Sequence, residues 1–312
     1  MNKLSLLAVI LTALVAVSPA AAHDRTDTLK LPAEFSLPHS VATGPDGATW
    51  VTDSSLGRIW RIGKHDRIRH YELGQQPGAI VTAHGSMWVA DAGGDAIHRV
   101  EADGSSVRYP LAAGTFPISL VKGPDGAIWY TAGRSDAIGR LALDGSVTEY
   151  PIPTKGAFAS DIMVGPDGAM WFSEQSTHKV GRVTTAGEIT EYAVPGVAPL
   201  PGPIVAGPDG ALYVAERNDN VISRFTTASV FTGDFPLPRE NANPMSMVVG
   251  PDGALYISEH SRGVVLRMTF KGKFTKKYKV PGGFNDSLAF GRHGELWVTQ
   301  GSIGKITRLD VG

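Results

Sequence analysis

The sequence predicts an all-β protein folded as a seven-bladed β-propeller with four-stranded antiparallel blades. A phrase similar to GPDGAIWYTAGRSDAIGRL, which occupies residues 123–141, occurs seven times and carries an aromatic residue near its centre. Successive aromatic residues are separated by 38, 41, 42, 42, 43 and 41 positions, and an arginine follows each one after 11 positions. A period of this length, with short apolar runs and glycine-rich turns, is typical of propeller blades.

Each repeat predicts four strands. In the third repeat we expect strands at 119–122, 127–131, 137–143 and 146–151. A Gly-Pro-Asp-Gly turn separates the first two strands, and an Asp-Gly hairpin turn separates the last two. The long amphipathic stretches that helical repeats of similar length need do not occur in the sequence.

The two ends of the sequence predict how the ring closes. The seventh repeat stops after its third strand, at 304–309, and a strand-like segment at 27–31 precedes the first repeat. We therefore expect this N-terminal strand to complete the last blade and cover its exposed edge. Residues 23–312 would then form a single propeller domain, and a closed ring of this kind is expected to be a monomer.

Residues 1–22 have the features of a secretory signal: Lys3, an apolar run at 4–17 and three small residues at 20–22. We expect cleavage before His23 and a periplasmic or secreted protein without a membrane span. The remaining chain has 28 basic and 30 acidic residues, which excludes a strong electrostatic footprint for nucleic acid or anionic lipid. Cysteine is absent, so the protein has no disulfide or thiol chemistry.

Residues that recur in every blade are predicted to be scaffold rather than site. We expect the aromatic residues to pack between adjacent sheets; they are Trp50, Trp88, Trp129, Trp171, Tyr213, Tyr256 and Trp297. The arginines are expected to form hydrogen bonds or ion pairs between blades; they are Arg61, Arg99, Arg140, Arg182, Arg224, Arg267 and Arg308.

Functional residues are expected where the blades differ. The first strand of a blade begins, and the second ends, on the same face of the disc, so two rings of residues should line the mouth of the central channel. The first ring, five residues before each turn, is His39, Gly78, Ile118, Ser160, Gly202, Met245 and Asp286. The second ring, three residues after each aromatic, is Asp53, Asp91, Ala132, Glu174, Glu216, Glu259 and Gln300.

The acids of the second ring suggest a metal site. Carboxylates that converge on an axis repel one another unless a cation lies among them. The sequence therefore predicts a divalent metal, expected to be Mg²⁺, with ligands Asp53, Glu174, Glu216 and Glu259. The alternative is that these acids point away from the axis or pair with loop residues such as Arg134, Lys179, Arg217 and Arg262.

Two histidines of the rim are candidate general bases. His39 is the one histidine of the first ring, and His260 follows Glu259 at the same rim. An imidazole among carboxylates can accept a proton near neutral pH, whereas a rim histidine without that role is simply polar surface.

The repeats resemble the virginiamycin B lyase (streptogramin B lyase) family, most clearly at 127–153 and 169–195, for example AMWFSEQSTHKVGRVTTAGEITEYAVP. The resemblance implies a seven-bladed propeller that confers antibiotic resistance by opening a cyclic depsipeptide at its ester linkage. The reaction it implies is C–O elimination without water, with magnesium as electrophile and histidine as base.

This sequence departs from the implied site at four positions. The resemblance places histidines at Met245 and Asp286, and metal-binding glutamates at Phe284 and Gln300. A histidine-plus-carboxylate arrangement displaced by one blade would use His39 together with Asp53 and Asp286.

Three functions follow from these observations. The first is a metal-assisted lyase acting on a cyclic depsipeptide or ester. The second is a non-catalytic propeller that binds a small molecule or peptide at the channel mouth. The third is a lactone hydrolase of the gluconolactonase type, although the glutamate–asparagine–aspartate ligand set of that type has no clear match here.

Overall fold

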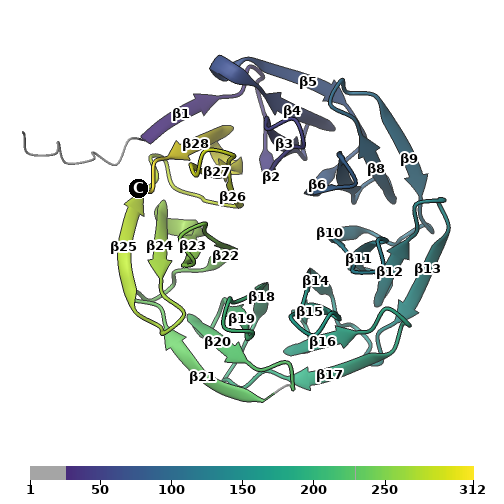
Figure 1. The fold of residues 1–312 in the computed structure, drawn as a ribbon, viewed down its shortest axis with the longest axis vertical. Helices are drawn as coiled ribbons and strands as arrows, with labels where there is room; N and C mark the ends of the chain where they lie inside the picture. Colours follow the sequence, from purple (N-terminus) through teal and green to yellow (C-terminus); the bar gives the residue numbers. More distant parts are fainter. Residues whose placement is uncertain (1–25, 229) are drawn as a thin grey trace, which may run out of the picture.

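The computed structural model describes residues 26–228 and 230–312, and in these residues seven four-stranded antiparallel sheets are arranged in a ring around a central axis (Figure 1). The prediction of a seven-bladed propeller is confirmed. The predicted signal segment, 1–22, lies outside the described residues. No helix in the described part of the chain has the length and apolar character needed to cross a membrane.

The strands follow one another from the channel outward in each blade. Blade 1 contains β2 (Pro38–Thr43), β3 (Thr49–Asp53), β4 (Arg58–Ile62) and β5 (Ile68–Glu72). Blade 2 contains β6 (Pro77–Ala83), β7 (Ser86–Asp91), β8 (Ala96–Val100) and β9 (Ser106–Pro110). Blade 3 contains β10 (Pro117–Lys122), β11 (Ile128–Ala132), β12 (Ala137–Leu141) and β13 (Val147–Pro151), close to the predicted bounds. Blade 4 contains β14 (Ala159–Val164), β15 (Met170–Glu174), β16 (Lys179–Val183) and β17 (Ile189–Ala193).

The remaining blades repeat this plan. Blade 5 contains β18 (Pro201–Ala206), β19 (Leu212–Glu216), β20 (Val221–Phe225) and β21 (Phe231–Pro236). Blade 6 contains β22 (Pro244–Val249), β23 (Leu255–Glu259), β24 (Val264–Met268) and β25 (Phe274–Lys279). Blade 7 contains β26 (Leu288–Phe290), β27 (Leu296–Gln300), β28 (Lys305–Leu309) and, from the other end of the chain, β1 (Thr26–Lys30). Short 3-10 turns are η1 (Lys64–Asp66), η2 (His260–Arg262) and η3 (Gly301–Ile303).

The N-terminal strand closes the ring as predicted. Strand β1 pairs antiparallel with β28, with Thr26 opposite Leu309 (Figure 1). Arg308 of β28 forms ion pairs with Asp27 of β1 at 2.9 Å and with Asp66 of blade 1 at 3.1 Å. One guanidinium therefore ties the last blade, the N-terminal strand and the first blade together.

The recurring aromatic residues pack between blades, which confirms their predicted role. Trp88 of blade 2, for example, shares a buried cluster with Leu120, Ile128 and Tyr130 of blade 3. Each of the other six contacts apolar residues of the following blade in the same way. Burial of these large rings is a major source of the free energy that holds adjacent sheets together.

The prediction that the recurring arginines join different blades is wrong for most of them. Arg140 donates to Asp125, in the turn of its own blade, at 2.7 Å, and the same carboxylate accepts from the indole Nε1 of Trp129 at 3.0 Å. Four other blades repeat this pairing in Arg61–Asp46, Arg182–Asp167, Arg224–Asp209 and Arg267–Asp252. The reason is register: Trp129 and Arg140 are cross-strand partners, so the turn beside them is the nearest source of a carboxylate.

Candidate functional site

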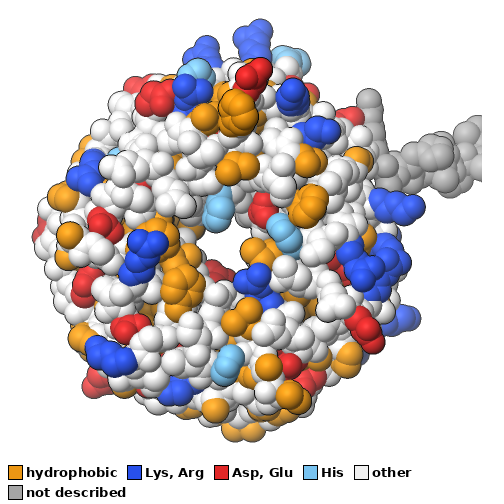
Figure 2. Space-filling view, turned by 180° about the vertical axis from the view of Figure 1, so that it is seen from behind, with side chains coloured by type: hydrophobic (Ala, Val, Ile, Leu, Met, Phe, Trp, Pro, Cys, Tyr) orange, Lys and Arg blue, Asp and Glu red, His pale blue; other side chains and the backbone are white. Residues whose placement is uncertain are grey.

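The first strands of the blades line a cavity of about 470 Å³ at the mouth of the central channel. Figure 2 shows histidine, acidic and basic side chains around the opening, among hydrophobic ones. Six of the seven predicted first-ring residues belong to the cavity wall, Gly78 being the exception: His39, Ile118, Ser160, Gly202, Met245 and Asp286. The first ring was therefore placed well from the sequence.

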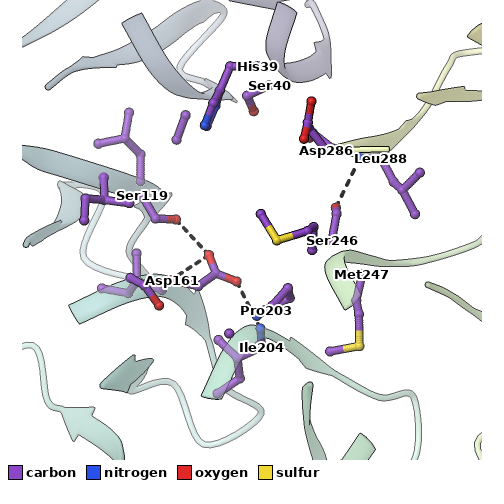
Figure 3. Close-up of a pocket in the computed structure, with 18 of the residues that line it drawn as sticks. His39, Ser40, Ser119, Asp161, Pro203, Ile204, Ser246, Met247, Asp286 and Leu288 are labelled. Atoms are coloured by element: carbon purple, nitrogen blue, oxygen red, sulfur yellow. Dashed lines mark hydrogen bonds between the residues drawn. The ribbon is translucent and has the colours of Figure 1, made fainter. Parts of the chain in front are cut away.

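Blades 1, 6 and 7 bring His39, His260 and Asp286 to the same part of the rim. The Oδ1 atom of Asp286 lies 3.1 Å from Nδ1 of His260, and its Oδ2 accepts a hydrogen bond from the Gly301 amide at 2.7 Å. His39 faces the cavity beside Asp286 (Figure 3). Its carbonyl oxygen accepts from Thr299 of blade 7 at 2.8 Å, which fixes its backbone against that blade.

The residues around the cavity shift the pKa values of His39 and Asp286. The His39 side chain is exposed to the channel, yet desolvation by the surrounding walls lowers its pKa, and the charge of Asp286 opposes this effect. Burial raises the pKa of Asp286, against the opposing influence of the Gly301 amide and both imidazoles. A lowered pKa favours the neutral imidazole, which can accept a proton, and the charge of Asp286 favours the cation that results.

The prediction that the second ring lines the channel is wrong. Its acids are at most 1 % exposed and none of them belongs to the cavity wall: Asp53, Asp91, Glu174, Glu216 and Glu259. The second strand of each blade is one strand removed from the axis. Its side chains point to the two faces of the sheet, and neighbouring blades cover both faces.

Hydrogen-bond donors keep the aspartates of the second ring ionised. Asp53 accepts from Ser36 Oγ at 2.5 Å, Trp60 Nε1 at 3.0 Å and the Leu37 amide at 3.1 Å. Burial alone would raise the pKa of Asp53, but these donors outweigh it and lower the pKa. The oxygens of Asp53 are therefore occupied by partners from its own blade and from the segment that precedes it.

The glutamates of the second ring have fewer donors. Neither carboxyl oxygen of Glu216 or Glu259 has a hydrogen-bond partner in the described part of the chain. Burial, followed by the charges of Asp219 and Asp234, raises the pKa of Glu216 to about 8. Burial also raises the pKa of Glu259, and it raises that of Glu174 to about 7, although Thr177 donates to Glu174.

These observations do not fit a magnesium ion shared by Asp53, Glu174, Glu216 and Glu259. All four residues are buried away from the cavity wall, and one of them is committed to its own donors. Within residues 26–228 and 230–312, no group of three or more His, Cys, Asp or Glu side chains is arranged to hold a metal. These four carboxylates therefore do not form the predicted metal site.

The positions that depart from the family resemblance have other roles. Gln300 is buried, and its Nε2 donates to the carbonyl oxygens of Pro281 at 2.9 Å and Gly283 at 2.7 Å. Its Oε1 accepts from Thr307 at 2.7 Å. Phe284 is 42 % exposed and its ring lies edge-on to His260, with 5.6 Å between the ring centroids. Gln300 is thus a structural residue, whereas Phe284 is part of the rim.

Sequence reasoning missed Asp161 as a residue of the channel wall. Its carboxylate accepts from Ser119 Oγ of blade 3 at 2.8 Å and from the Ile204 amide of blade 5 at 3.0 Å, so it links three blades (Figure 3). Burial raises its pKa, against the effect of these donors. A signal existed in the sequence, because the equivalent position holds no other acid: Ser40, Ala79, Ser119, Pro203, Ser246 and Ser287.

Replacing Glu216 with glutamine is expected to make the folding stability less dependent on pH. The pKa of Glu216 is raised in the folded state, so the folded protein binds more protons than the unfolded one between about pH 4.5 and 8. The free energy of unfolding therefore falls across this window, by roughly 2–4 kcal/mol from this group. Urea unfolding at pH 5 and pH 8 would show Glu216→Gln gaining stability relative to the wild type at the higher pH.

The reverse substitution, Gln300→Glu, is the matched control. It would place a carboxyl group against two carbonyl oxygens and should introduce a new loss of stability at high pH. Parallel pH profiles for the wild type and Glu216→Gln would contradict the assignment of a neutral Glu216.

Comparisons with known proteins concern the family and the fold. The sequence model of a family described as "Virginiamycin B lyase family" matches residues 25–232 and 200–312. A structure described as a streptogramin B lyase has 27% sequence identity and a TM-score of 0.87, covering 95% of this chain and 100% of that one. A catalytically inactive histidine-to-alanine virginiamycin B lyase from Staphylococcus aureus, crystallised with quinupristin, has 28% identity and a TM-score of 0.86, covering 93% and 100%.

Two further comparisons give no additional information on the family. A hydrazine synthase from Kuenenia stuttgartiensis has 15% identity and a TM-score of 0.74, covering 90% of this chain and 97% of that one, which shows a shared fold alone. A sequence search of curated proteins gives no significant match.

Proposed function

This chain belongs to the virginiamycin B lyase family, and from that premise we propose that it is a C–O lyase that opens a cyclic depsipeptide or ester at the channel mouth. The observation that carries the proposal is that His39 and Asp286 line one cavity, and that His260 lies 3.1 Å from Asp286. The S. aureus virginiamycin B lyase, crystallised in an inactive form with quinupristin, suggests the substrate class.

In the proposed reaction, His39 is the general base. Its neutral imidazole removes the proton on the carbon next to a carbonyl group, and the C–H electrons form a carbon–carbon double bond. The neighbouring C–O bond breaks, and the ester oxygen leaves as part of a carboxylate. No water is added, so the product has the composition of the substrate with its ring opened.

Asp286 has two tasks in this mechanism. Its carboxylate stabilises the imidazolium that forms when His39 takes the proton, and it holds His260 through Nδ1. The Gly301 amide fixes the carboxylate itself. Because both histidines interact with one anion, the cluster can receive a proton and release it again without a large change in geometry.

We also propose that the protein is exported and acts as a monomer outside the cytoplasm. The signal-like composition of residues 1–22 supports export. Pairing of β1 with β28 supports the monomer, because this pairing leaves the last blade with a covered edge.

Mass spectrometry of a reaction with quinupristin tests the proposed activity. Elimination yields a linear product with the same mass as the substrate and a new double bond. Hydrolysis by a lactonase-like site would instead add the mass of one water. Repeating the reaction with a chelator and with added Mg²⁺ tests the metal prediction separately.

A non-catalytic binding propeller is the second candidate. It is favoured by the structural use of Gln300, whose amide is fully committed to the Pro281 and Gly283 carbonyls and to Thr307. Binding of quinupristin without any ring-opened product, over a range of pH and metal concentration, would support this candidate and overturn the lyase proposal.

A further inference from the structure

The rim of the cavity contains a guanidinium group without an acidic partner. Arg217 follows β19 and lies on the cavity wall with its side chain half-buried. Its Nε donates to Oδ1 of Asn243 at 2.9 Å, and the described residues provide it with no ion pair. Burial lowers its pKa, and no carboxylate offsets this effect. The recurring arginines on the third strands, by contrast, all have carboxylate partners.

The structure makes room for Arg217 and holds it in place. A Cβ atom at Gly202 would lie 3.0 Å from Cδ of Arg217, so the absence of a side chain there lets the arginine lie against β18. Asn243 has a left-handed backbone conformation with φ of 49°, and its carboxamide fixes the Nε edge of the guanidinium. The two terminal nitrogens remain available to a ligand in the cavity.

Arg217 is also connected to the proposed acid–base group. The carbonyl oxygen of Asn243 accepts from the His260 amide at 3.3 Å, and His260 contacts Asp286. A single residue of the linker between blades 5 and 6 therefore positions both the guanidinium and the backbone of His260.

We propose that Arg217 is the carboxylate-binding residue of the cavity. The inference deepens the proposed function and rests on it for the identity of the ligand. An elimination that breaks the C–O bond of an ester releases a carboxylate, and an arginine binds two carboxylate oxygens through parallel N–H donors. Arg217 stabilises the negative charge as the C–O bond breaks and the electron pair passes to the ester oxygen.

Ligand binding tests this role without any need for turnover. The probes are N-acetyl-L-phenylalanine, which has a carboxylate, and its uncharged amide; the aromatic ring suits the exposed Phe284, which lies against His260. Titration of the full propeller, followed by the ¹⁵N-labelled Nε signal of Arg217, should show at least about tenfold tighter binding of the acid than of the amide. Arg217→Met should remove this preference.

Two further variants separate positioning from folding. Asn243→Gly keeps the left-handed backbone but deletes the carboxamide, so it should weaken the preference for the acid while the fold is retained. Arg134→Met is the matched control, because Arg134 lies against the Phe116 ring, at 3.9 Å from its centroid, and is absent from the cavity wall.

The result is decisive in either direction. Equal affinity for acid and amide, a preference that survives in Arg217→Met, or no binding of the acid up to its solubility limit would each overturn the proposal. If the protein fails to open quinupristin but Arg217 still selects the carboxylate, the lyase proposal fails and the carboxylate site stands.

Discussion

Replacing His39 with alanine should abolish ring opening of quinupristin, with kcat/KM lowered by about 10²–10⁴-fold, the usual contribution of a general base. His39 is the histidine of the described residues that lines the cavity, and the walls around it lower its pKa. Loss of this group removes the histidine that lines the cavity in the described residues. Mass spectrometry of timed reactions would measure the effect.

The pH dependence distinguishes a chemical role of His39 from a structural one. Activity should rise with pH as His39 loses its proton, with a midpoint below the ordinary histidine value because desolvation by the channel walls lowers its pKa. Asp286→Asn removes the negative charge that opposes this shift, so the midpoint should move to still lower pH in any activity that remains. A His39→Ala enzyme with an unchanged rate would rule out the proposed base.

Removal of the N-terminal strand is expected to have the largest effect on stability. A chain that begins at Pro32 loses the pairing of β1 with β28, the ion pair between Asp27 and Arg308, and the burial of Leu31, which is 1 % exposed. Burial of a leucine contributes roughly 1.5–3 kcal/mol on its own, and the exposed edge of β28 adds the cost of unpaired backbone groups. The free energy of unfolding should fall by at least about 3 kcal/mol.

Denaturant unfolding compared with a chain that begins at His23 measures this loss. Arg308→Met in that longer chain is the control, since it removes the two ion pairs but keeps the strand. The control should lose much less stability than the truncated chain, because ion pairs at the surface contribute little. Equal stability of the truncated and longer chains would show that closure does not depend on β1.

The fold was predictable because the length and internal spacing of the repeat indicate the strands of each blade. The 11-residue spacing from aromatic to arginine is a cross-strand pair in each blade, as Trp129 opposite Arg140 shows. The missing fourth strand of the last repeat and the strand-like segment before the first repeat specified the closure. These features depend on local pairing and burial, which a linear sequence records directly.

The candidate site was predictable only where residues face the axis. The first ring lies on the innermost strands, so its position in the repeat was enough to place His39 and Asp286 on the cavity wall. The second ring failed because counting positions gives the end of a strand but not which neighbouring sheet covers it. Asp53 and Glu216 occupy the same place in the repeat. Asp53 accepts hydrogen bonds from Ser36 and Trp60, whereas the carboxyl oxygens of Glu216 have no hydrogen-bond partner in the described residues.

The sequence by itself determined the number of blades, the strand order, the closure and the family, because these follow from a periodic pattern of buried aromatic residues and turns. The tertiary structure alone decided which acids are charged, which arginine lacks a carboxylate partner, and that His260 of blade 6 meets Asp286 of blade 7. The physical reason is that charge and hydrogen bonding depend on atoms from several blades within a few ångströms, and the repeat specifies each blade separately.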